Sequence, residues 1–402
     1  MSILNVQNRS FSVSGVLRLL TRALIVLLLI YEGWYVEKYE AASFVLKLLT
    51  MLIICCTFLY IILFKKSKIC ISVVFAFWLT FGIVSFVFGL FTHLTSLINS
   101  ELFTYFAFLI VCYCVSVFCE NGDTDWLINT FIIITVLSIV SVFFEGYQYQ
   151  NGDYYAITMG PNNNPNTLGL MMSIGAYYLL NRSKKYNAFV GLLQLSLAVV
   201  CFIVVLNTGS RSGLICFLTT IVFTVIFKMI FMNGNLIKRQ IKRIAISVTC
   251  IAAVITMLSY LGTIGIGSSG INRLIDRFNT SSYSGRWDLY VEAWKVFVDN
   301  PIFGVGYKCF SEVSAFDYFT HSTYMELLSC TGVVGTVLFL TPVLIALKNS
   351  VHFIRCDKGK SVNIIMLFFV GGLFGIWYYN LVFMLIIYIT VLMSFRMEFG
   401  VK

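Results

Sequence analysis

The stretch SFVLKLLTMLIICCTFLYIILF, residues 43–64, decides the class of fold. Its only charged residue is Lys47, which lies near the start, and the other side chains are apolar or uncharged. A helix needs about 20 mostly apolar residues to cross the hydrocarbon core of a bilayer. The stretch therefore predicts a transmembrane helix.

The whole chain of 402 residues resembles that stretch in composition. Hydrophobic residues make up 59% of it and charged residues only 11%, whereas soluble domains average roughly a quarter charged residues. Such a chain cannot cover a water-facing surface with charge, and it holds no polar block large enough to form a soluble domain. The sequence predicts an all-α polytopic membrane protein that forms a single integral membrane domain over residues 1–402.

Hydropathy predicts about twelve transmembrane helices. They are residues 19–35, 43–64, 69–92, 102–119, 127–144, 167–180, 188–206, 214–232, 244–261, 323–347, 363–379 and 381–395. The last two nearly fuse, so one long tilted helix is the alternative, and it would reduce the count to eleven.

The distribution of Lys and Arg predicts the orientation. Basic residues gather near both termini and in alternate loops, at residues 65–68, 182–185, 238–243 and 348–360. The positive-inside rule assigns this side, and with it both termini, to the cytoplasm. The net charge of +10 does not indicate a nucleic-acid partner, because arms that bind nucleic acid are longer and interleaved with polar residues.

The opposite side carries one large external loop, residues 262–321, between the ninth and tenth spans. Loops of that length are usually functional. Residues 271–278 and 287–298 show apolar residues at helical spacing, and Asp299-Asn300-Pro301 ends the second run. We expect two amphipathic helices that lie on the membrane face or cap a cavity.

Two external arginines are not explained by topology. Arg211 follows Ser210 in the tight turn NTGSRSG, residues 207–213, where backbone N–H groups and a guanidinium can approach one phosphate. Arg286 stands at the start of the second amphipathic helix, where an anion would also meet the helix N-terminus. Alternatively, Arg211 reaches lipid phosphate at a helix end, and Arg286 is solvated or paired with Asp288 or Asp276.

His321 and Glu326 lie where the large loop enters the tenth span. An imidazole can accept a proton near neutral pH or bind phosphate, and an acid at membrane depth is a functional-site candidate. Taken alone, an anchoring His and a capping Glu explain both residues. The topology, however, places Arg211, Arg286 and His321 on the same face, which predicts a site for a lipid-linked phosphate.

Cysteine and carboxylate spacing give no sign of a metal or cofactor. Most of the 12 cysteines lie inside apolar runs, where they behave as small hydrophobic residues. No CxxC pair, His/Cys cluster or external DxD pair is present in the sequence. A disulfide between Cys309 and Cys330 is not favoured, and residues 1–15 lack the cleavage pattern of a signal peptide.

Several motifs resemble the O-antigen polymerase and ligase superfamily. They are SGRWDLYVEAWKVFVDNPIFGVG at residues 284–306, HSTYMELLSCTGVVG at 321–335, TGSRSG at 208–213 and PNNNPN at 161–166. The resemblance covers roughly the second half of the chain, and the first five spans carry no signature.

The resemblance implies a GT-C-like, metal-independent, inverting glycosyltransferase of a bacterial inner (plasma) membrane. Its donor and acceptor would be undecaprenyl-diphosphate-linked glycans, and a protein that regulates chain length would be a partner. Arg211 and Arg286 would bind the donor pyrophosphate, and His321 would be catalytic or bind phosphate. The remaining residues expected to contact the pyrophosphate or glycan are Ser210, Arg277 and Asn166.

Three functions remain open at this point. The main interpretation is a polymerase of repeat units for O-antigen or capsular polysaccharide, and its closest alternative is a ligase that transfers the finished glycan to lipid A core or protein. The third is a flippase of lipid-linked oligosaccharides, which would line a mid-membrane cavity with charge. Lys47 and Lys228 lie near span ends and can reach the interface, so the sequence favours an enzyme.

Overall fold

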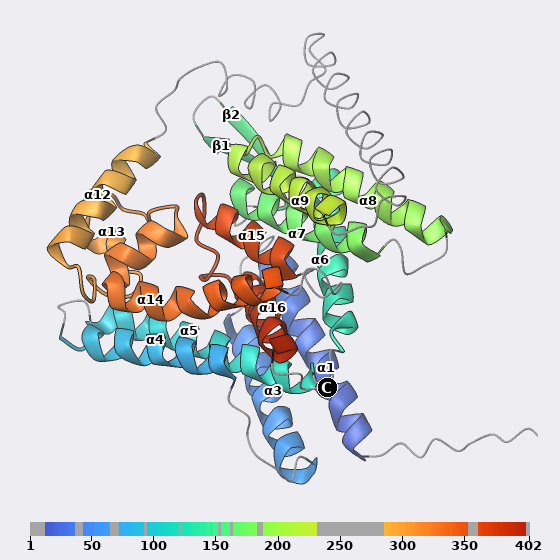
Figure 1. Ribbon diagram of the computed structural model, residues 1–402, viewed down its shortest axis with the longest axis horizontal. Helices are drawn as coiled ribbons and strands as arrows, with labels where there is room; N and C mark the ends of the chain where they lie inside the picture. Colours follow the sequence, from blue (N-terminus) through green and yellow to red (C-terminus); the bar gives the residue numbers. More distant parts are fainter. Residues whose placement is uncertain are drawn as a thin grey trace, which may run out of the picture.

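Figure 1 shows the protein as a computed structural model. The structure describes residues 13–36, 43–64, 72–91, 95–119, 123–145, 147–151, 154–160, 164–182, 188–230, 285–352 and 361–398. The predicted span at 244–261, the predicted amphipathic helix at 271–278 and Arg277 lie outside these residues.

The other predicted spans correspond to helices among the described residues. They are α1 (Val13–Ile30) with its π-helical continuation η1 (Tyr31–Tyr35), α3 (Ser43–Phe64), α4 (Val73–Gly89), α5 (Thr95–Phe118), α6 (Asp125–Glu145), α7 (Pro165–Arg182), α8 (Ala188–Asn207), α9 (Arg211–Ile230), α14 (Thr323–His352), α15 (Ser361–Gly372) and α16 (Leu381–Glu398). In the described part of the chain, six helices are long and apolar enough to cross a membrane, and four apolar helices are shorter. The protein is a polytopic membrane protein, and the count of twelve spans stays a prediction.

One element departs from the all-α prediction. Strands β1 (Tyr147–Asn151) and β2 (Tyr154–Thr158) form an antiparallel pair in which Tyr147 lies opposite Thr158. Tyrosine, isoleucine and threonine favour extended backbone because their side chains pack well on a pleated surface. The polar segment between α6 and α7 therefore carries a β-hairpin.

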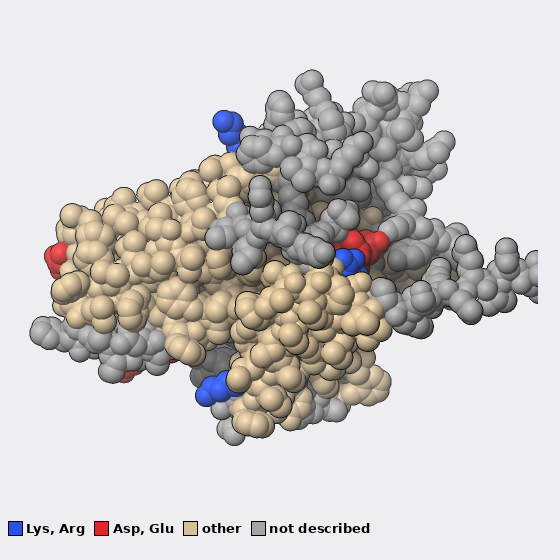
Figure 2. All heavy atoms as spheres, turned by 90° about the horizontal axis from the view of Figure 1, so that it is seen from below, with Lys and Arg blue, Asp and Glu red and all other residues tan. Residues whose placement is uncertain are grey.

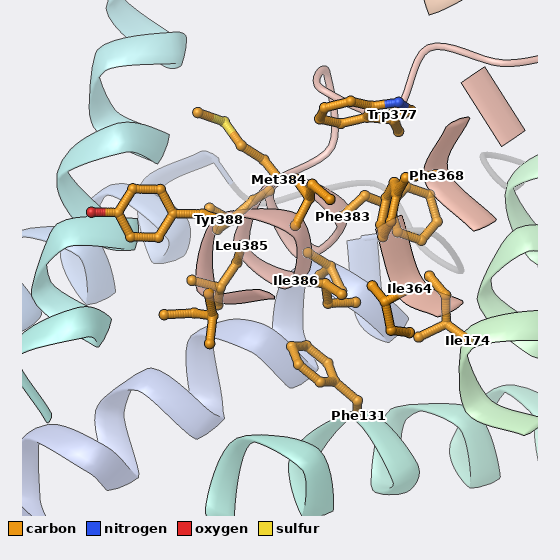
Figure 3. Close-up of a cluster of buried hydrophobic side chains, with 14 of the residues drawn as sticks. Phe131, Ile174, Ile364, Phe368, Trp377, Phe383, Met384, Leu385, Ile386 and Tyr388 are labelled. Carbon is orange, nitrogen blue, oxygen red and sulfur yellow. The ribbon is translucent and has the colours of Figure 1, made fainter. Parts of the chain in front are cut away.

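Helix α16 lies at the centre of the bundle. Its residues are apolar all round and almost all buried from Leu381 to Leu392, as expected for a helix without a solvent face. In Figure 3, Met384, Leu385 and Ile386 of α16 lie among side chains of α6, α7 and α15, including Phe131 and Ile364.

The outer surface of the bundle is apolar. Helices α3 and α8 expose large side chains such as Phe44, Phe58 and Phe189. Figure 2 shows one face of the molecule on which the described atoms are almost entirely those of uncharged residues. Such a surface is suited to lipid and would be unstable in water.

The acidic loop near Asp123 is neutralised by the basic end of α1. Arg22 Nη2 donates to Asp123 Oδ2 at 2.7 Å and to the carbonyl oxygen of Phe118 at 2.8 Å. This contact places the start of α1 and the α5–α6 connection at the same end of the bundle, as the predicted topology requires.

Helix α15 is shorter than the predicted span. It ends at Gly372, and residues 373–380 form a non-helical segment before α16 begins. Both the boundary at 379 and the alternative of one long tilted helix are therefore wrong. The backbone of this segment is bonded in part to α14: Thr323 donates through its N–H and its hydroxyl to the carbonyl oxygen of Gly375, at 3.2 and 2.8 Å. Irregular backbone is tolerated within a membrane protein where other protein groups satisfy it in this way.

Helix α14 is broken at Gly332, whose φ of 60° and ψ of −165° are not helical. The preceding loop completes the hydrogen bonds that the break leaves open. Val305 and Gly306 donate to the carbonyl oxygens of Ser329 and Cys330 at 3.1 and 2.9 Å, and Val333 donates to that of Pro301 at 2.9 Å. The NPIFGVG motif is thus a segment that is hydrogen-bonded along the broken helix.

The predicted helix at 287–298 is confirmed as α12 (Arg286–Asp299). Leu289, Ala293 and Val296 are buried in a small core with Phe310 of the short helix α13 (Phe310–Val313) and Cys330 of α14. The apolar residues that predicted the helix lie on its other side and are exposed, among them Trp287, Trp294 and Val298. Helix α12 is therefore apolar on two sides, one packed on α14 and one open.

The helices form two groups with α15 and α16 between them (Figure 1). Helices α7, α8 and α9 pack on one another, and α12, α13, α4 and α5 lie around α14. Arg211 belongs to the first group, whereas Arg286 and His321 belong to the second.

Candidate functional site

The Arg211 turn is held by a set of small polar residues. Gly209 has a φ of 60°, which lets the chain reverse between α8 and α9. Asn166 Oδ1 on α7 accepts hydrogen bonds from the hydroxyls of Ser210 and Ser212, both at 2.6 Å. Ser210 Oγ also accepts the backbone N–H of Gly213 at 3.0 Å and so caps α9.

Close packing between α7 and α9 fixes the same turn. A Cβ added at Gly169 would lie 2.5 Å from Cα of Gly213, so both positions need glycine for the helices to approach. Arg211 is the first residue of α9 and is partly exposed. The turn therefore places the guanidinium at the helix N-terminus, where anions are favoured.

Arg286 occupies the equivalent position at the start of α12. Burial lowers the pKa of Arg286, and the positive charge of Arg211 lowers it further, whereas Tyr290 acts in the opposite direction. The effect of Arg211 means that the two guanidinium groups lie in the same region although 75 residues separate them in sequence. Neither the predicted ion pair with Asp288 nor any other carboxylate contact of Arg286 is present among the described residues.

His321 lies immediately before α14 in a strained backbone conformation. Its φ is 56°, which is rare for a residue other than glycine. The imidazole packs edge-on against Phe319, with ring centroids 4.6 Å apart, and lies 6.0 Å from the ring of Tyr318. Burial first, and then the charge of Arg286, lower the pKa of His321 to about 4.

The structure thus brings together residues from three separate elements. Arg286 acts electrostatically on His321 and is itself acted on by Arg211. Ser210 and Asn166 lie beside Arg211 through the hydrogen bonds of its turn. The described part of this region therefore holds two cations and one imidazole that is neutral at pH 7.

Glu326 lies deeper, on the first turns of α14, and only 1% of it is exposed. Its Oε2 accepts the backbone N–H of Thr320 at 2.9 Å, and its Oε1 accepts the hydroxyl of Tyr379 at 2.8 Å. The thiol of Cys330 donates to Oε1 at 3.6 Å. The carboxylate therefore binds the residue before His321 and does not face the open side of the site.

Sequence reasoning missed two tyrosines that connect the site to α15 and to the segment that follows it. Tyr290, one turn after Arg286, donates to the carbonyl oxygen of Leu373 at 3.0 Å. Tyr324 donates to the carbonyl oxygen of Phe369 at 2.8 Å. The spacing of Tyr290 from Arg286 was a signal for a shared helix face, but its partner lies 83 residues away in sequence.

Lys308 and Lys295 do not add free charge to the site. Lys308 Nζ lies 2.6 Å from Glu101 Oε2 and 4.4 Å from the ring centre of Tyr379. Lys295 Nζ lies 3.2 Å from Glu292 Oε2 on the exposed side of α12. Each of these two lysines is therefore neutralised by a glutamate of its own.

The described residues hold no group of three or more His, Cys, Asp or Glu side chains arranged to bind a metal ion. Cys309 and Cys330 are both buried and not disulfide-bonded. This arrangement of side chains does not test whether the reaction needs a metal ion, so the metal independence of the reaction stays a prediction.

The chain matches a known family over its second half. No curated protein matches the chain. The sequence family described as O-antigen ligase matches residues 196–340, a segment that runs from α8 into α14 and includes Arg211, Arg286 and His321. Over this segment, which is less than half of the chain, the protein is similar to the O-antigen ligase family.

Proposed function

We propose that the protein is a glycosyltransferase that acts on glycans linked to undecaprenyl diphosphate, at the external face of a bacterial inner membrane. The match of residues 196–340 to the family described as O-antigen ligase supports this class of reaction. The observation that carries the proposal is the convergence of Arg211, Arg286 and His321 from three elements. Two fixed cations beside a neutral imidazole suit the displacement of a diphosphate by a hydroxyl group.

The two arginines would stabilise the leaving group. In the reaction, an acceptor hydroxyl oxygen bonds to the anomeric carbon while the bond from that carbon to the diphosphate oxygen breaks. The electron pair leaves with the polyprenyl diphosphate, and the anomeric centre inverts. Arg211 and Arg286 each begin a helix, so guanidinium and backbone N–H groups can bind the growing negative charge together. The hydroxyls of Ser210 and Ser212 donate to Oδ1 of Asn166, so these bonds do not use its NH2 group, which we propose contacts the donor.

His321 would take the proton from the acceptor hydroxyl. With its pKa lowered to about 4, the imidazole is unprotonated at pH 7 and has a free nitrogen for this proton. The same shift argues against a role as an imidazolium ligand of phosphate. A diphosphate bound at Arg286 would offset the charge of that arginine and so raise the pKa of His321, which makes the imidazole a stronger base once the donor is in place.

Glu326 would support the site from behind. It is almost fully buried, and both of its carboxylate oxygens are hydrogen-bonded within the protein. A carboxylate whose two oxygens are already hydrogen-bonded is suited to hold the backbone before His321 in place and not to take a proton from a substrate. Of the four candidate catalytic residues we therefore propose Arg211, Arg286 and His321 as the groups that touch the substrate.

We favour a polymerase that joins repeat units of an O-antigen or capsule, with a chain-length regulator as partner. A ligase is the second candidate, because the family that matches residues 196–340 is described as O-antigen ligase. The two activities share the donor and the leaving group and differ in the acceptor. The cations on the described helix ends lie together at one end of the bundle, which suits an enzyme better than a flippase.

Deletion of the gene tests the proposal, with the surface glycan separated by size on a gel. Loss of the ladder with retention of a single repeat unit on the anchor indicates a polymerase. Loss of all repeat units from the anchor, with long glycan still on the lipid carrier, indicates a ligase. Accumulation of single repeat units that stay on the cytoplasmic face of the membrane would instead indicate a flippase and refute the proposed glycosyl transfer.

A further inference from the structure

We propose that Glu326, Tyr379, Lys308 and Glu101 form a connected set of positioning residues that holds His321 in its left-handed backbone conformation. None of the four is offered as a group that touches the substrate. The inference rests on the proposed function for the use of His321 as a base, whereas the contacts themselves do not depend on that function.

The backbone on both sides of His321 is clamped. Thr320 is fully buried, and its N–H donates to Glu326 Oε2 at 2.9 Å while its hydroxyl donates to the carbonyl oxygen of Ser322 at 2.9 Å. The hydroxyl of Ser322 donates to the carbonyl oxygen of Gly372 at 3.3 Å. A residue with a φ of 56° persists only where its surroundings over-determine it, and the bonds on either side of His321 meet that requirement.

Tyr379 connects Glu326 to a second charged pair. Its hydroxyl donates to Glu326 Oε1 at 2.8 Å, and Lys308 Nζ lies 4.4 Å from the centre of its ring. Lys308 in turn lies 2.6 Å from Glu101 Oε2 at the start of α5. A buried carboxylate needs hydrogen bonds and a nearby cation to offset its lost hydration, and Tyr379 supplies the bond while presenting its ring to the cation.

Glu326 acts on the main chain and not on the imidazole. Only burial and Arg286 contribute to the lowered pKa of His321, so the carboxylate is not a partner of the ring as it would be in a Ser-His-Asp triad. The Glu326 carboxylate accepts the backbone N–H of Thr320 and so holds the main chain next to His321. The imidazole itself stays neutral. The arrangement holds the backbone that carries the ring without raising the proton affinity of the imidazole.

Chemical modification of His321 tests the inference without any glycan substrate. The chain has three histidines, so His93→Gln and His352→Gln leave His321 as the only imidazole in the full-length protein. Diethyl pyrocarbonate reacts with the neutral imidazole, and the ratio of its rates at pH 5.5 and pH 8 reports the fraction of neutral His321 at the lower pH. In the parent this ratio should be close to one, because the imidazole is neutral at both values.

Tyr379→Phe removes the hydroxyl that holds Glu326 and keeps the ring. If His321 then relaxes toward solvent and its ordinary pKa near 6.5, the ratio should fall roughly tenfold. Tyr378→Phe is the control, because Tyr378 is the adjacent residue, is buried, and donates to the hydroxyl of Tyr379 at 3.5 Å and not to Glu326. Glu326→Gln, which keeps one acceptor oxygen for Thr320, should reduce the ratio less than Tyr379→Phe does.

Lys308→Met gives a second variant if Tyr379→Phe does not yield folded protein by gel filtration, and it should lower the ratio in the same direction. An unchanged ratio in the folded variants overturns the inference. An equal fall in Tyr378→Phe also overturns it, because the effect would then be general loosening of the segment. A protein that lacks glycosyl transfer activity but shows the specific fall would refute the proposed function and leave these positioning contacts in place.

Discussion

Substitution of Gly332 by alanine should be among the most damaging single-atom changes in this protein. The glycine has a φ of 60° and a ψ of −165°, a region that is essentially restricted to glycine and costs other residues about 1–3 kcal/mol. An added Cβ would lie 2.4 Å from the carbonyl carbon and oxygen of Ile302, which are backbone atoms of the loop that completes the broken helix. Overpacking of this kind costs about 1–3 kcal/mol more, so the expected total is roughly 2–6 kcal/mol.

The assay is thermal unfolding of the purified protein in detergent, followed by tryptophan fluorescence. Gly332→Ala should lower the Tm by at least about 3 °C, and glycosyl transfer should fall because the loop at 301–306 sets how α12, and with it Arg286, lies on α14. Gly285→Ala is the matched control: a Cβ there meets nothing within 4 Å, and its φ is −51°. If the two variants unfold at the same temperature, the break in α14 does not depend on glycine and this reasoning is refuted.

Three further predictions concern the site and the topology. Arg211→Ala and Arg286→Ala should each abolish chain extension at normal expression, and Lys should recover little at either position because it cannot bind diphosphate bidentately; wild-type extension in both Ala variants would place the diphosphate elsewhere. For the general base His321, whose imidazole lies beside Tyr318 and is affected by the charge of Arg286, kcat/KM should fall only below about pH 4–5. By contrast, kcat should fall nearer pH 6, because the bound diphosphate offsets the charge of Arg286. His321→Gln should be inactive, and loss of activity on the alkaline side alone would contradict the role of His321 as the base. In a variant depleted of its 12 cysteines, a single cysteine introduced as Ser268→Cys should react with a membrane-impermeant maleimide in intact cells, and labelling only after the membrane is opened would reverse the proposed orientation.

The helices were predictable from the sequence because each span must bury its own backbone hydrogen bonds, and only long apolar runs can do this within a bilayer. The sequence-based prediction of helices is wrong where contacts with other elements of the fold replace the hydrogen bonds within a helix. Residues 373–380 are apolar enough to extend α15, but Thr323 binds Gly375 and the helix ends at Gly372. The β-hairpin had a local signal that the prediction did not use, since Asn151-Gly152 is a dipeptide typical of tight hairpin turns.

The site was predictable to the extent that topology determines it. Arg211, Arg286 and His321 were assigned to one face by counting spans, and their electrostatic effects on one another are in line with that assignment. The supporting contacts were not predictable, because the hydroxyl of Tyr379 finds Glu326 across 53 residues of sequence. The lowered pKa of His321 was not predictable either, because it depends on burial and on the nearby charge of Arg286, which the sequence does not show.

The central position of α16 has a consequence for biosynthesis. This helix contacts α4, α5, α14, α15 and η1, yet it follows all of them in the chain and therefore leaves the ribosome after them. The earlier helices must remain in the membrane with their inward faces unpaired until α16 is inserted between them. A premature stop just before Leu381 should therefore give a truncated protein with these faces unpaired. Membrane proteases should degrade it as efficiently as the product of a stop near the start of the coding sequence.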